Sequence, residues 1–386
     1  MMDNIKSTWV EYELGELLSY EQPTPYIVES TDYNDKYKTP VLTAGKSFVL
    51  GYTNETHGVY TALPVIIFDD FTTASQYVNF EFKVKSSAMK ILTPNTELVL
   101  PKFIYYRMQI IQFDHSTHKR YWIQQYSKIK VSIPPIPVQE QIVAKIEELF
   151  SELDNGVETL RKTKQQLAVY RQAVLKSAFG VIAQDAYRPL RTVLSSSPQN
   201  GLYKPKTAYG SGTRILRIDG FYDGRISDDY DFKRLALSES EIKQYQLNKW
   251  DLVINRVNSM PYLGKCALVR DLAEVTVYES NMMRMRLDEN TVDPEYVTHY
   301  LSSFIGRKEL TKNAKQAVNQ ASINQTDVGN ALIPVPKSLE EQRNVVSEIN
   351  ARMSVCDNIE KTVDTALQQA EAMRQSILKQ AFEGSL

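Results

Sequence analysis

Two stretches decide the fold: QEQIVAKIEELFSELDNGVETLRKTKQQLAVYRQAVLKSAF at residues 139–179, and QRNVVSEINARMSVCDNIEKTVDTALQQAEAMRQSILKQAF at residues 342–382. Their residue numbers differ by 203 throughout, the alignment needs no gap, and 15 of the 41 positions are identical. The chain therefore contains an internal repeat. Such a repeat is considered before any other signal because it determines the architecture.

Apolar residues recur every seven positions in both copies. This spacing predicts two long helices, each packed along its length against another helix. Prolines stand just before each copy, where a helix tolerates them. The residues expected to form the helix–helix seam are Ile146, Leu153, Leu160, Leu167 and Val174 in the first copy, with Ile349, Cys356, Val363, Ala370 and Ile377 in the second.

A block with strand-like runs and short helical segments precedes each long helix. LPVIIF at 63–68 and DLVIN at 251–255 are typical of buried strands. We therefore predict an α+β fold: two globular mixed α/β blocks separated by two long helices, which pack as an antiparallel coiled coil with pseudo-two-fold internal symmetry. The expected boundaries are 1–135 for the first block, 136–182 for the first helix, 183–336 for the second block and 337–386 for the second helix.

The composition narrows the class of protein. The 386 residues include 45 Lys and Arg against 46 Asp and Glu, a formal net charge of -1, so no strongly basic coat covers the chain. Two cysteines exclude a disulfide scaffold. No apolar run reaches the ~18 residues of a membrane span, and the N-terminus lacks a signal-peptide layout. We expect a cytoplasmic protein without a membrane partner.

Motifs for catalysis are sparse. The sequence has no GxxxxGK[ST] phosphate loop and no Asn/Asp-Pro-Pro-aromatic segment of an adenine methyltransferase. His115 and His118 lack a partnered carboxylate motif, so we expect no metal site there. One enzymatic alternative stays open, a metal-dependent nuclease that uses Asp70, Glu81 and Lys83. A second alternative is a structural coiled-coil adaptor that does not bind DNA.

The two helical repeats resemble those of the specificity subunits of Type I restriction–modification systems. Two segments carry this resemblance. The first runs from Ile133 through Gln139-Glu140-Gln141-Ile142 to Ala178-Phe179, and the second is its copy, which ends at Ala381-Phe382. Trp250-Asp251-Leu252-Val253-Ile254-Asn255-Arg256 in the second block adds to it, whereas the corresponding Phe68-Asp69-Asp70-Phe71-Thr72-Thr73 in the first block fits more loosely. The resemblance covers nearly the whole chain.

This resemblance implies a non-catalytic subunit. Each block would be a target recognition domain that reads one half of a split sequence in double-stranded DNA. The helices would set the spacing between the halves and dock two adenine-methyltransferase (modification) subunits, which motor-nuclease (restriction) subunits join. No cofactor is expected in this chain, because S-adenosylmethionine, ATP and magnesium would belong to those partners.

DNA-facing groups are expected among Arg, Lys, Asn, Gln and hydroxyl side chains in loops that follow strands. Residues 188–336 hold 20 basic and 17 acidic side chains, which gives +3, whereas residues 1–134 hold 13 and 14, which gives -1. The candidates in the second block are Lys204, Lys206, Arg256, Asn258, Ser259, Lys265, Asn281, Arg284, Lys315, Gln320, Ser322, Asn324 and Gln325. Those in the first block are Lys46, Thr72, Thr73, Tyr77, Lys119, Arg120, Gln124 and Gln125.

Overall fold

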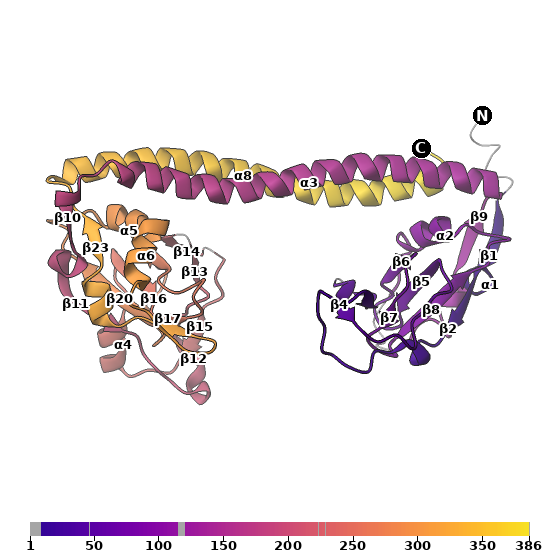
Figure 1. The fold of residues 1–386 in the computed structure, drawn as a ribbon, viewed down its shortest axis with the longest axis horizontal. Helices are drawn as coiled ribbons and strands as arrows, with labels where there is room; N and C mark the ends of the chain where they lie inside the picture. The colour runs from indigo at the N-terminus through magenta and orange to yellow at the C-terminus, as the bar shows by residue number, and fades with distance from the viewer. Residues whose placement is uncertain (1–8, 46, 115–119, 223, 228, 386) are drawn as a thin grey trace. The chain divides into compact units, whose positions relative to one another are not determined.

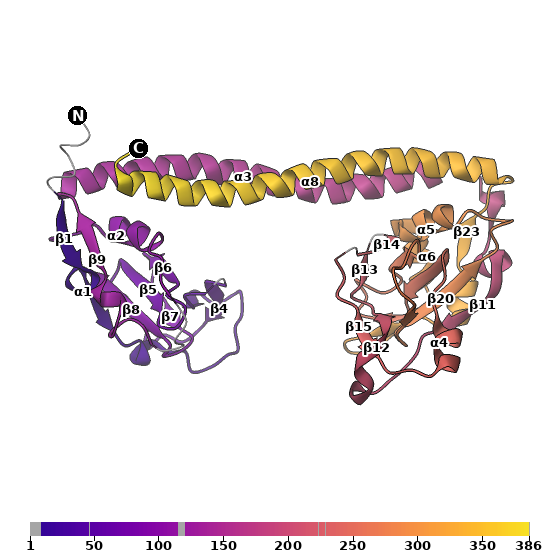
Figure 2. The same ribbon diagram turned by 180° about the vertical axis from the view of Figure 1, so that it is seen from behind.

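The computed structural model describes residues 9–45, 47–114, 120–222, 224–227 and 229–385. The chain divides into two compact units, Met1–Arg161 with Asp364–Leu386, and Lys162–Val363. Each unit combines one globular block with parts of the two long helices, α3 (Ile136–Gly180) and α8 (Leu339–Glu383) (Figures 1 and 2). Among the described residues, no helix is long and apolar enough to cross a membrane.

The block of the first unit is built on a four-stranded antiparallel sheet with the strand order β2-β8-β5-β6. Its strand β5 contains the run expected from the sequence, and four consecutive side chains from Val65 to Phe68 are fully buried. The strands of this sheet are β2 (Leu18–Glu21), β8 (Met89–Pro94), β5 (Val65–Asp69) and β6 (Ser75–Val78).

Two smaller sheets and two helices complete this block. A three-stranded sheet has the order β4 (Val49–Thr53), β3 (Thr39–Leu42), β7 (Lys83–Val84), and β1 (Val10–Glu13) pairs with β9 (Lys130–Ile133). The helices are α1 (Leu14–Leu17) and α2 (Pro101–Met108), with 3-10 turns η3 (Thr24–Tyr26) and η4 (Tyr126–Lys128). Helix α2 lies between the sheet and the long helices, because Phe103 and Ile104 are buried in the same core as Ile146 and Phe382 (Figure 1).

The block of the second unit has a six-stranded sheet with the order β11-β20-β16-β18-β14-β13. All five side chains of β16 are buried, as expected for the run at 251–255. The strands are β11 (Leu194–Asn200), β20 (Met282–Leu287), β16 (Asp251–Asn255), β18 (Cys266–Leu268), β14 (Gly224–Ile226) and β13 (Phe221–Tyr222).

Smaller sheets flank it. One three-stranded sheet has the order β15 (Lys233–Leu235), β12 (Tyr209–Leu216), β19 (Thr276–Tyr278). Another has the order β17 (Val257–Asn258), β22 (Ala321–Ser322), β21 (Lys315–Gln316). In addition, β10 (Tyr187–Pro189) pairs with β23 (Leu332–Pro334). The short helices are α4 (Glu239–Tyr245), α5 (Pro294–Ser302), α6 (Phe304–Thr311) and α7 (Gln325–Gly329), with 3-10 turns η5 (Gln184–Ala186), η6 (Leu190–Val193) and η7 (Lys206–Ala208).

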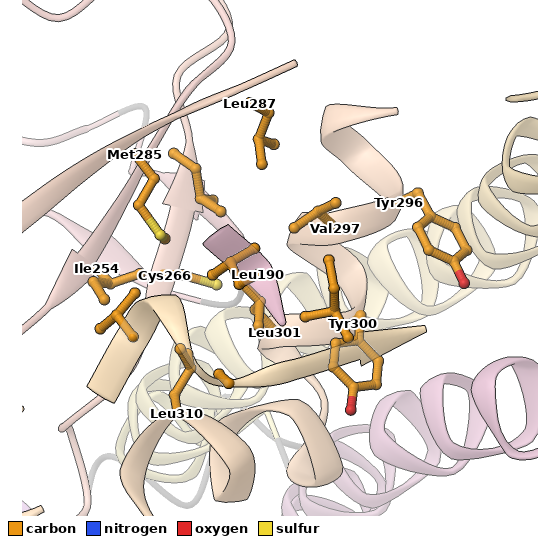
Figure 3. Packing of buried hydrophobic residues seen from close by; sticks show 14 of the residues in the cluster. Leu190, Ile254, Cys266, Met285, Leu287, Tyr296, Val297, Tyr300, Leu301 and Leu310 are labelled. Carbon is orange, nitrogen blue, oxygen red and sulfur yellow. The ribbon is translucent and has the colours of Figure 1, made fainter. Parts of the chain in front are cut away.

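Helices α5 and α6 lie between this sheet and the long helices in both views (Figures 1 and 2). Side chains of β16 and β20, including Ile254 and Met285, meet Val297 and Leu301 of α5 in one core (Figure 3). The same core reaches Phe179 near the end of α3 and Ile349 on α8. The block and the helices of this unit therefore share one hydrophobic core.

The long helices run antiparallel within each unit. In the first unit Arg374 of α8 forms an ion pair with Asp154 of α3. In the second, Arg171 of α3 lies 2.7 Å from Asp357 and 2.9 Å from Glu360 of α8. Arg171 and Arg374 are equivalent in the repeat, as are Asp154 and Asp357, so the internal symmetry extends to side-chain contacts. These contacts, with the mixed α/β blocks, confirm the predicted α+β class with an antiparallel helix pair.

The seam expected from the sequence is buried unevenly. Six of its residues are buried, namely Ile146, Leu167, Val174, Ile349, Cys356 and Val363. The other four are half-buried, namely Leu153, Leu160, Ala370 and Ile377. These four line a groove of about 330 Å³ in the first unit, together with Gly156 and Met373. The apolar stripes of α3 and α8 in this unit are therefore wider than the helix–helix contact, so part of each stripe remains open to solvent.

Gly156 gives a test of the helix in this groove. A glycine inside a helix costs about 0.5–1 kcal/mol relative to alanine, and a Cβ at position 156 meets no atom within 4 Å. We expect Gly156→Ala to raise the free energy of unfolding by about 0.5–1 kcal/mol, measured by thermal or urea unfolding. The matched control is Gly306→Ala in α6, where the Cβ would lie 2.1 Å from the carbonyl oxygen of Tyr300. That variant should be destabilised, and equal shifts for both would contradict the argument.

Candidate nucleic-acid interface

In both blocks, the residue after the central strand holds a loop from later in the chain. The carbonyl of Asp70, which follows β5, accepts a hydrogen bond from the Tyr121 amide at 2.9 Å. The carbonyl of Arg256, which follows β16, accepts one from the Ile323 amide at 2.9 Å. These contacts make Tyr121 of the first block equivalent to Ile323 of the second.

The first loop cluster consists of residues 69–74 and 120–125. The Asp69 carboxylate accepts hydrogen bonds from the amides of Phe71 and Thr72, both at 2.9 Å, and Thr73 has a φ of 57°. The guanidinium of Arg120 lies 5.9 Å from the centroid of the exposed Phe71 ring. The predicted residues Thr72, Thr73, Arg120, Gln124 and Gln125 are thus brought to one place, and all except Thr73 are exposed.

A buried ion pair supports this cluster from below. The ammonium of Lys90 lies 3.3 Å from the Asp70 carboxylate, and both side chains are 1% exposed. The same carboxylate accepts a hydrogen bond from the Trp122 amide at 2.8 Å. Asp70 therefore ties the two loops of the cluster to β8. Its burial and partners explain why an acidic residue stands where the second block has Arg256.

The nuclease arrangement that the sequence left open is not formed. Asp70 pairs with Lys90, and Lys83 is buried, 2.9 Å from Glu55. Burial acts to raise the pKa of Glu55, but hydrogen bonds from Lys83 and from the amide of Ser30 outweigh it and lower that pKa. Glu81 is exposed and precedes β7, so it does not share a strand face with Lys83. The described residues contain no group of three side chains suited to hold a metal ion.

One predicted residue of the first block, Tyr77, lies outside the first loop cluster. The ring of Tyr77 packs 6.0 Å from that of Tyr105 on α2, and the Lys102 ammonium lies 6.0 Å from its centroid. This contact directs Tyr77 toward α2. Lys46 and Lys119 lie outside the described residues, as do His115 and His118.

The second loop cluster consists of residues 256–265, 280–281 and 315–322. Arg256 joins its parts, because its guanidinium donates to the Ser280 carbonyl at 2.9 Å and its amide donates to the Asn281 carbonyl at 2.9 Å. The Lys265 ammonium lies 4.5 Å from the centroid of the exposed Tyr262 ring. The predicted residues Asn258, Ser259, Lys265 and Asn281 are half-buried in this cluster. Arg256 therefore holds the loops of this cluster together.

A hairpin projects from the second loop cluster. Strands β21 and β22 are joined by a tight turn in which the Ala317 amide donates to the Gln320 carbonyl at 2.7 Å. Ser322 pairs with Val257 of β17, so the hairpin is attached to the strand that follows Arg256. Lys315, Gln316, Asn319 and Gln320 are exposed, and Val318 at the tip is 99% exposed.

Sequence reasoning named Lys315, Gln320 and Ser322 in this hairpin. The structure exposes Gln316 and Asn319 beside them, and Tyr262 in the neighbouring loop. The signal for the hairpin is the short polar run Lys315-Gln316 and Asn319-Gln320 around a turn. Tyr262 could have been found because it stands between the selected residues Ser259 and Lys265.

Four further predicted residues have partners outside the second loop cluster. Asn324 caps α7 by accepting a hydrogen bond from the Asp327 amide, and the Gln325 amide group donates to the Pro198 carbonyl. Lys204 lies 2.7 Å from Glu241, whose pKa is lowered to about 2 by hydrogen bonds from Lys204 and Ser238. Arg284 is only 6% exposed and donates to the Gln246 carbonyl at 2.6 Å. Lys206, in contrast, is exposed at the start of η7.

Arg284 belongs to a charge cluster within the six-stranded sheet, in which Asp251 and Arg284 are buried and Arg286 is partly exposed. The Asp251 carboxylate lies 3.8 Å from Arg284 and 3.1 Å from Arg286. Burial raises the pKa of Asp251, although both arginines act to lower it. This geometry favours a structural role for Arg284, since its buried guanidinium lies beside Asp251 across the paired strands β16 and β20.

The comparisons with known proteins agree on one family. Residues 6–167 match the Type I restriction modification DNA specificity domain. The chain is 33% identical to the Escherichia coli Type I restriction enzyme EcoR124I/EcoR124II specificity subunit, over 89% of this chain and 86% of that protein. It is 29% identical to the EcoKI specificity subunit of Escherichia coli strain K12, over 68% of this chain and 58% of that protein.

A solved structure shares the fold. It comes from work on complex assembly and conformational transition of the type I R-M system. The two chains superpose with a TM-score of 0.69 over 98% of each, at 16% sequence identity.

The stability of variants at Arg284 and Lys315 should distinguish a structural residue from a surface residue among those predicted. Removing one member of a buried charge cluster leaves an unpaired charge and costs ~3–5 kcal/mol. We expect Arg284→Met to lower the free energy of unfolding by ~3 kcal/mol, the lower end of this range, because Arg286 still pairs with Asp251. The matched control Lys315→Met, on the exposed hairpin, should change the free energy of unfolding by less than ~0.5 kcal/mol. Urea unfolding measures both, and a neutral Arg284→Met would reopen a surface role for that residue.

Proposed function

Because the chain belongs to the family of Type I restriction enzyme specificity subunits, we propose that its two loop clusters each read one half of a bipartite target in double-stranded DNA. The observation that carries this proposal is the common construction of the two blocks. In each, the residue after a buried central strand pins a later loop, and polar side chains gather on the exposed side. The support is shared between the blocks although their loops have different sequences.

The side chains present suit base reading. Glutamine and asparagine amides can bind adenine through two hydrogen bonds, and arginine or lysine can bind guanine in the major groove. The hairpin at 315–322 presents Gln316, Asn319 and Gln320 beside Lys315, and two-stranded ribbons are known to enter that groove. The first loop cluster presents Arg120, Gln124 and Gln125 in the same way. Exposed aromatic rings at Phe71 and Tyr262 add apolar contact surface.

The chain acts in this proposal without catalysis of its own. Methylation and cleavage come from partner subunits, which carry S-adenosylmethionine, ATP and magnesium. We place the complex in the cytoplasm because its ligand is DNA. The adaptor alternative gives no role to two differently built loop clusters. In the nuclease alternative, Asp70 and Lys83 are each held in an ion pair with another residue.

The helix groove of the first unit is the proposed docking place for one of the two adenine-methyltransferase subunits. The groove lies between residues 149–160 of α3 and 366–377 of α8, and Met373 at its edge is 55% exposed. Apolar positions at helical spacing that a two-helix seam leaves open are suited to a partner's apolar side chains. Motor-nuclease subunits would join the assembly through the methyltransferases.

Reading by the hairpin can be tested with Gln320→Ala. Losing one bidentate base contact should weaken discrimination at a single base pair by ~1–3 kcal/mol and leave binding to random DNA unchanged. The assay is methylation-site mapping of the assembled complex. The matched variant Gln124→Ala should relax the other half-site, and Gln368→Ala on an exposed face of α8 should relax neither. Uniform loss at all sequences would reduce Gln320 to a phosphate contact or a structural residue.

The spacing role of the helices can be tested by inserting one heptad into each. Thr163 and Ala366 are equivalent in the repeat, so paired insertions there preserve the seven-residue seam. Seven helical residues add ~10.5 Å, which corresponds to about three base pairs at ~3.4 Å each. We expect the unspecified spacer of the target to lengthen by about three base pairs with both half-sites unchanged. A spacer of unaltered length, or new half-sites, would show that the helices only dock partners.

A further inference from the structure

Two buried glutamines occupy the same position in the internal repeat. Gln139 stands near the start of α3 and Gln342 near the start of α8, and both are 0% exposed. Their residue numbers differ by 203, the offset of the repeat. A fully buried glutamine at the beginning of a long helix needs partners for both its carbonyl and its amide group.

Each glutamine binds the loop that opens a short helix of its own block. In the first unit the Leu100 amide donates to Gln139 at 2.8 Å, and the Gln139 amide group donates to the carbonyls of Leu98 at 3.0 Å and Pro134 at 2.8 Å. In the second unit the Asp293 amide donates to Gln342 at 2.8 Å, and Gln342 donates to the Thr291 carbonyl at 3.2 Å.

The two loops have the same local design. They read Leu98-Val99-Leu100-Pro101 and Thr291-Val292-Asp293-Pro294, with the central valine fully buried in both. Leu100 and Asp293 are the N-cap residues of α2 and α5. In a capping box, a Glu or Gln three residues into the same helix would satisfy the N-cap amide. Here that position holds Phe103 or Tyr296, so the long helix supplies the missing acceptor.

The same aromatic residues make the second half of the joint. Phe103 packs edge-on against Phe382, near the end of α8, with the ring centroids 5.2 Å apart. Tyr296 packs edge-on against Phe179, near the end of α3, at 5.3 Å. Phe179 and Phe382 are again equivalent in the repeat. Each short helix is thus held by the start of one long helix and the end of the other.

We propose that Gln139 and Gln342 are positioning residues, which fix the orientation of each block on its helices and thereby set which spacing of the two half-sites is accepted. An apolar side chain could fill the same volume, but it could not accept from an N–H and donate to a carbonyl at the same time. Hydrogen bonds of both kinds restrict how the block can turn about the edge-on aromatic contact. This inference rests on the proposed function and adds the residues that make the spacing selective.

The test uses the specificity subunit assembled with its methyltransferase partner. Gln139→Met, Gln342→Met and the double variant remove the amide but keep the side-chain length. Gln141→Met is the matched control, since Gln141 is exposed two residues along the same helix. DNA substrates carry the wild-type target with its spacer unchanged, shortened or lengthened by one base pair. A second set keeps the spacer and changes one base in either half-site.

We expect the wild type and Gln141→Met to prefer the native spacer equally. Gln139→Met and Gln342→Met should each reduce the preference for the native spacer over its neighbours by tenfold or more. Discrimination against a changed base should stay within twofold of the wild type. Hydrogen exchange at the amides of Leu100 and Asp293 should quicken in the matching variant, which reports the joint independently of DNA.

Two results would overturn the inference. One is a folded variant whose spacer preference stays within twofold of the wild type. The other is methylation that falls equally at every spacer, because the glutamine would then serve folding or assembly alone. Failure of the proposed function would look different, since the wild-type complex itself would then have no bipartite target.

Discussion

The structure depends on the way each short helix is held between the long helices. A block that packed on one helix alone could turn about that contact. In each unit the block instead contacts the start of one long helix through a buried glutamine and the end of the other through an edge-on aromatic pair. The cores that result, around Ile146 in one unit and Ile349 in the other, bury block and helix residues together. The burial of apolar side chains in these cores is the main favourable contribution to the free energy of folding.

The loop clusters can vary because their support does not reach into this joint. In the first block, Asp70 and Lys90 form a dry pair beneath the loops. In the second, Asp251 pairs with Arg284 and Arg286 within the strands β16 and β20, and the Arg256 backbone takes the place that Asp70 has in the first block. A buried charge needs a partner wherever it stands. The two blocks meet this need with different residues, and each keeps the same backbone contact below its own divergent surface loops.

The sequence predicted the parts of the fold that repeat or that form continuous apolar runs. The seven-residue spacing and the 203-residue offset predicted both long helices, and the runs at 63–68 and 251–255 predicted β5 and β16. Site prediction was weaker, because residue type does not tell an exposed arginine from a buried one. Arg284 and Lys315 were both selected as basic side chains, yet the first is buried within the sheet and the second is exposed on a hairpin. Only tertiary contacts distinguish them.

Gln139 and Gln342 illustrate a signal that the sequence did contain. Glutamine in a helix is ordinarily an exposed, neutral choice, so its identity in both copies carried little weight among 15 identities. The buried glutamine becomes informative only when the Val-x-Pro loops at 99–101 and 292–294 are set beside it. These loops differ by 193 in residue number, not 203, because the segments between them and the helices differ in length. Because the two offsets differ, the glutamine and the loop it binds must each be specified separately in the two blocks. The same pairing of glutamine and loop nevertheless occurs in both, as a common positioning role requires.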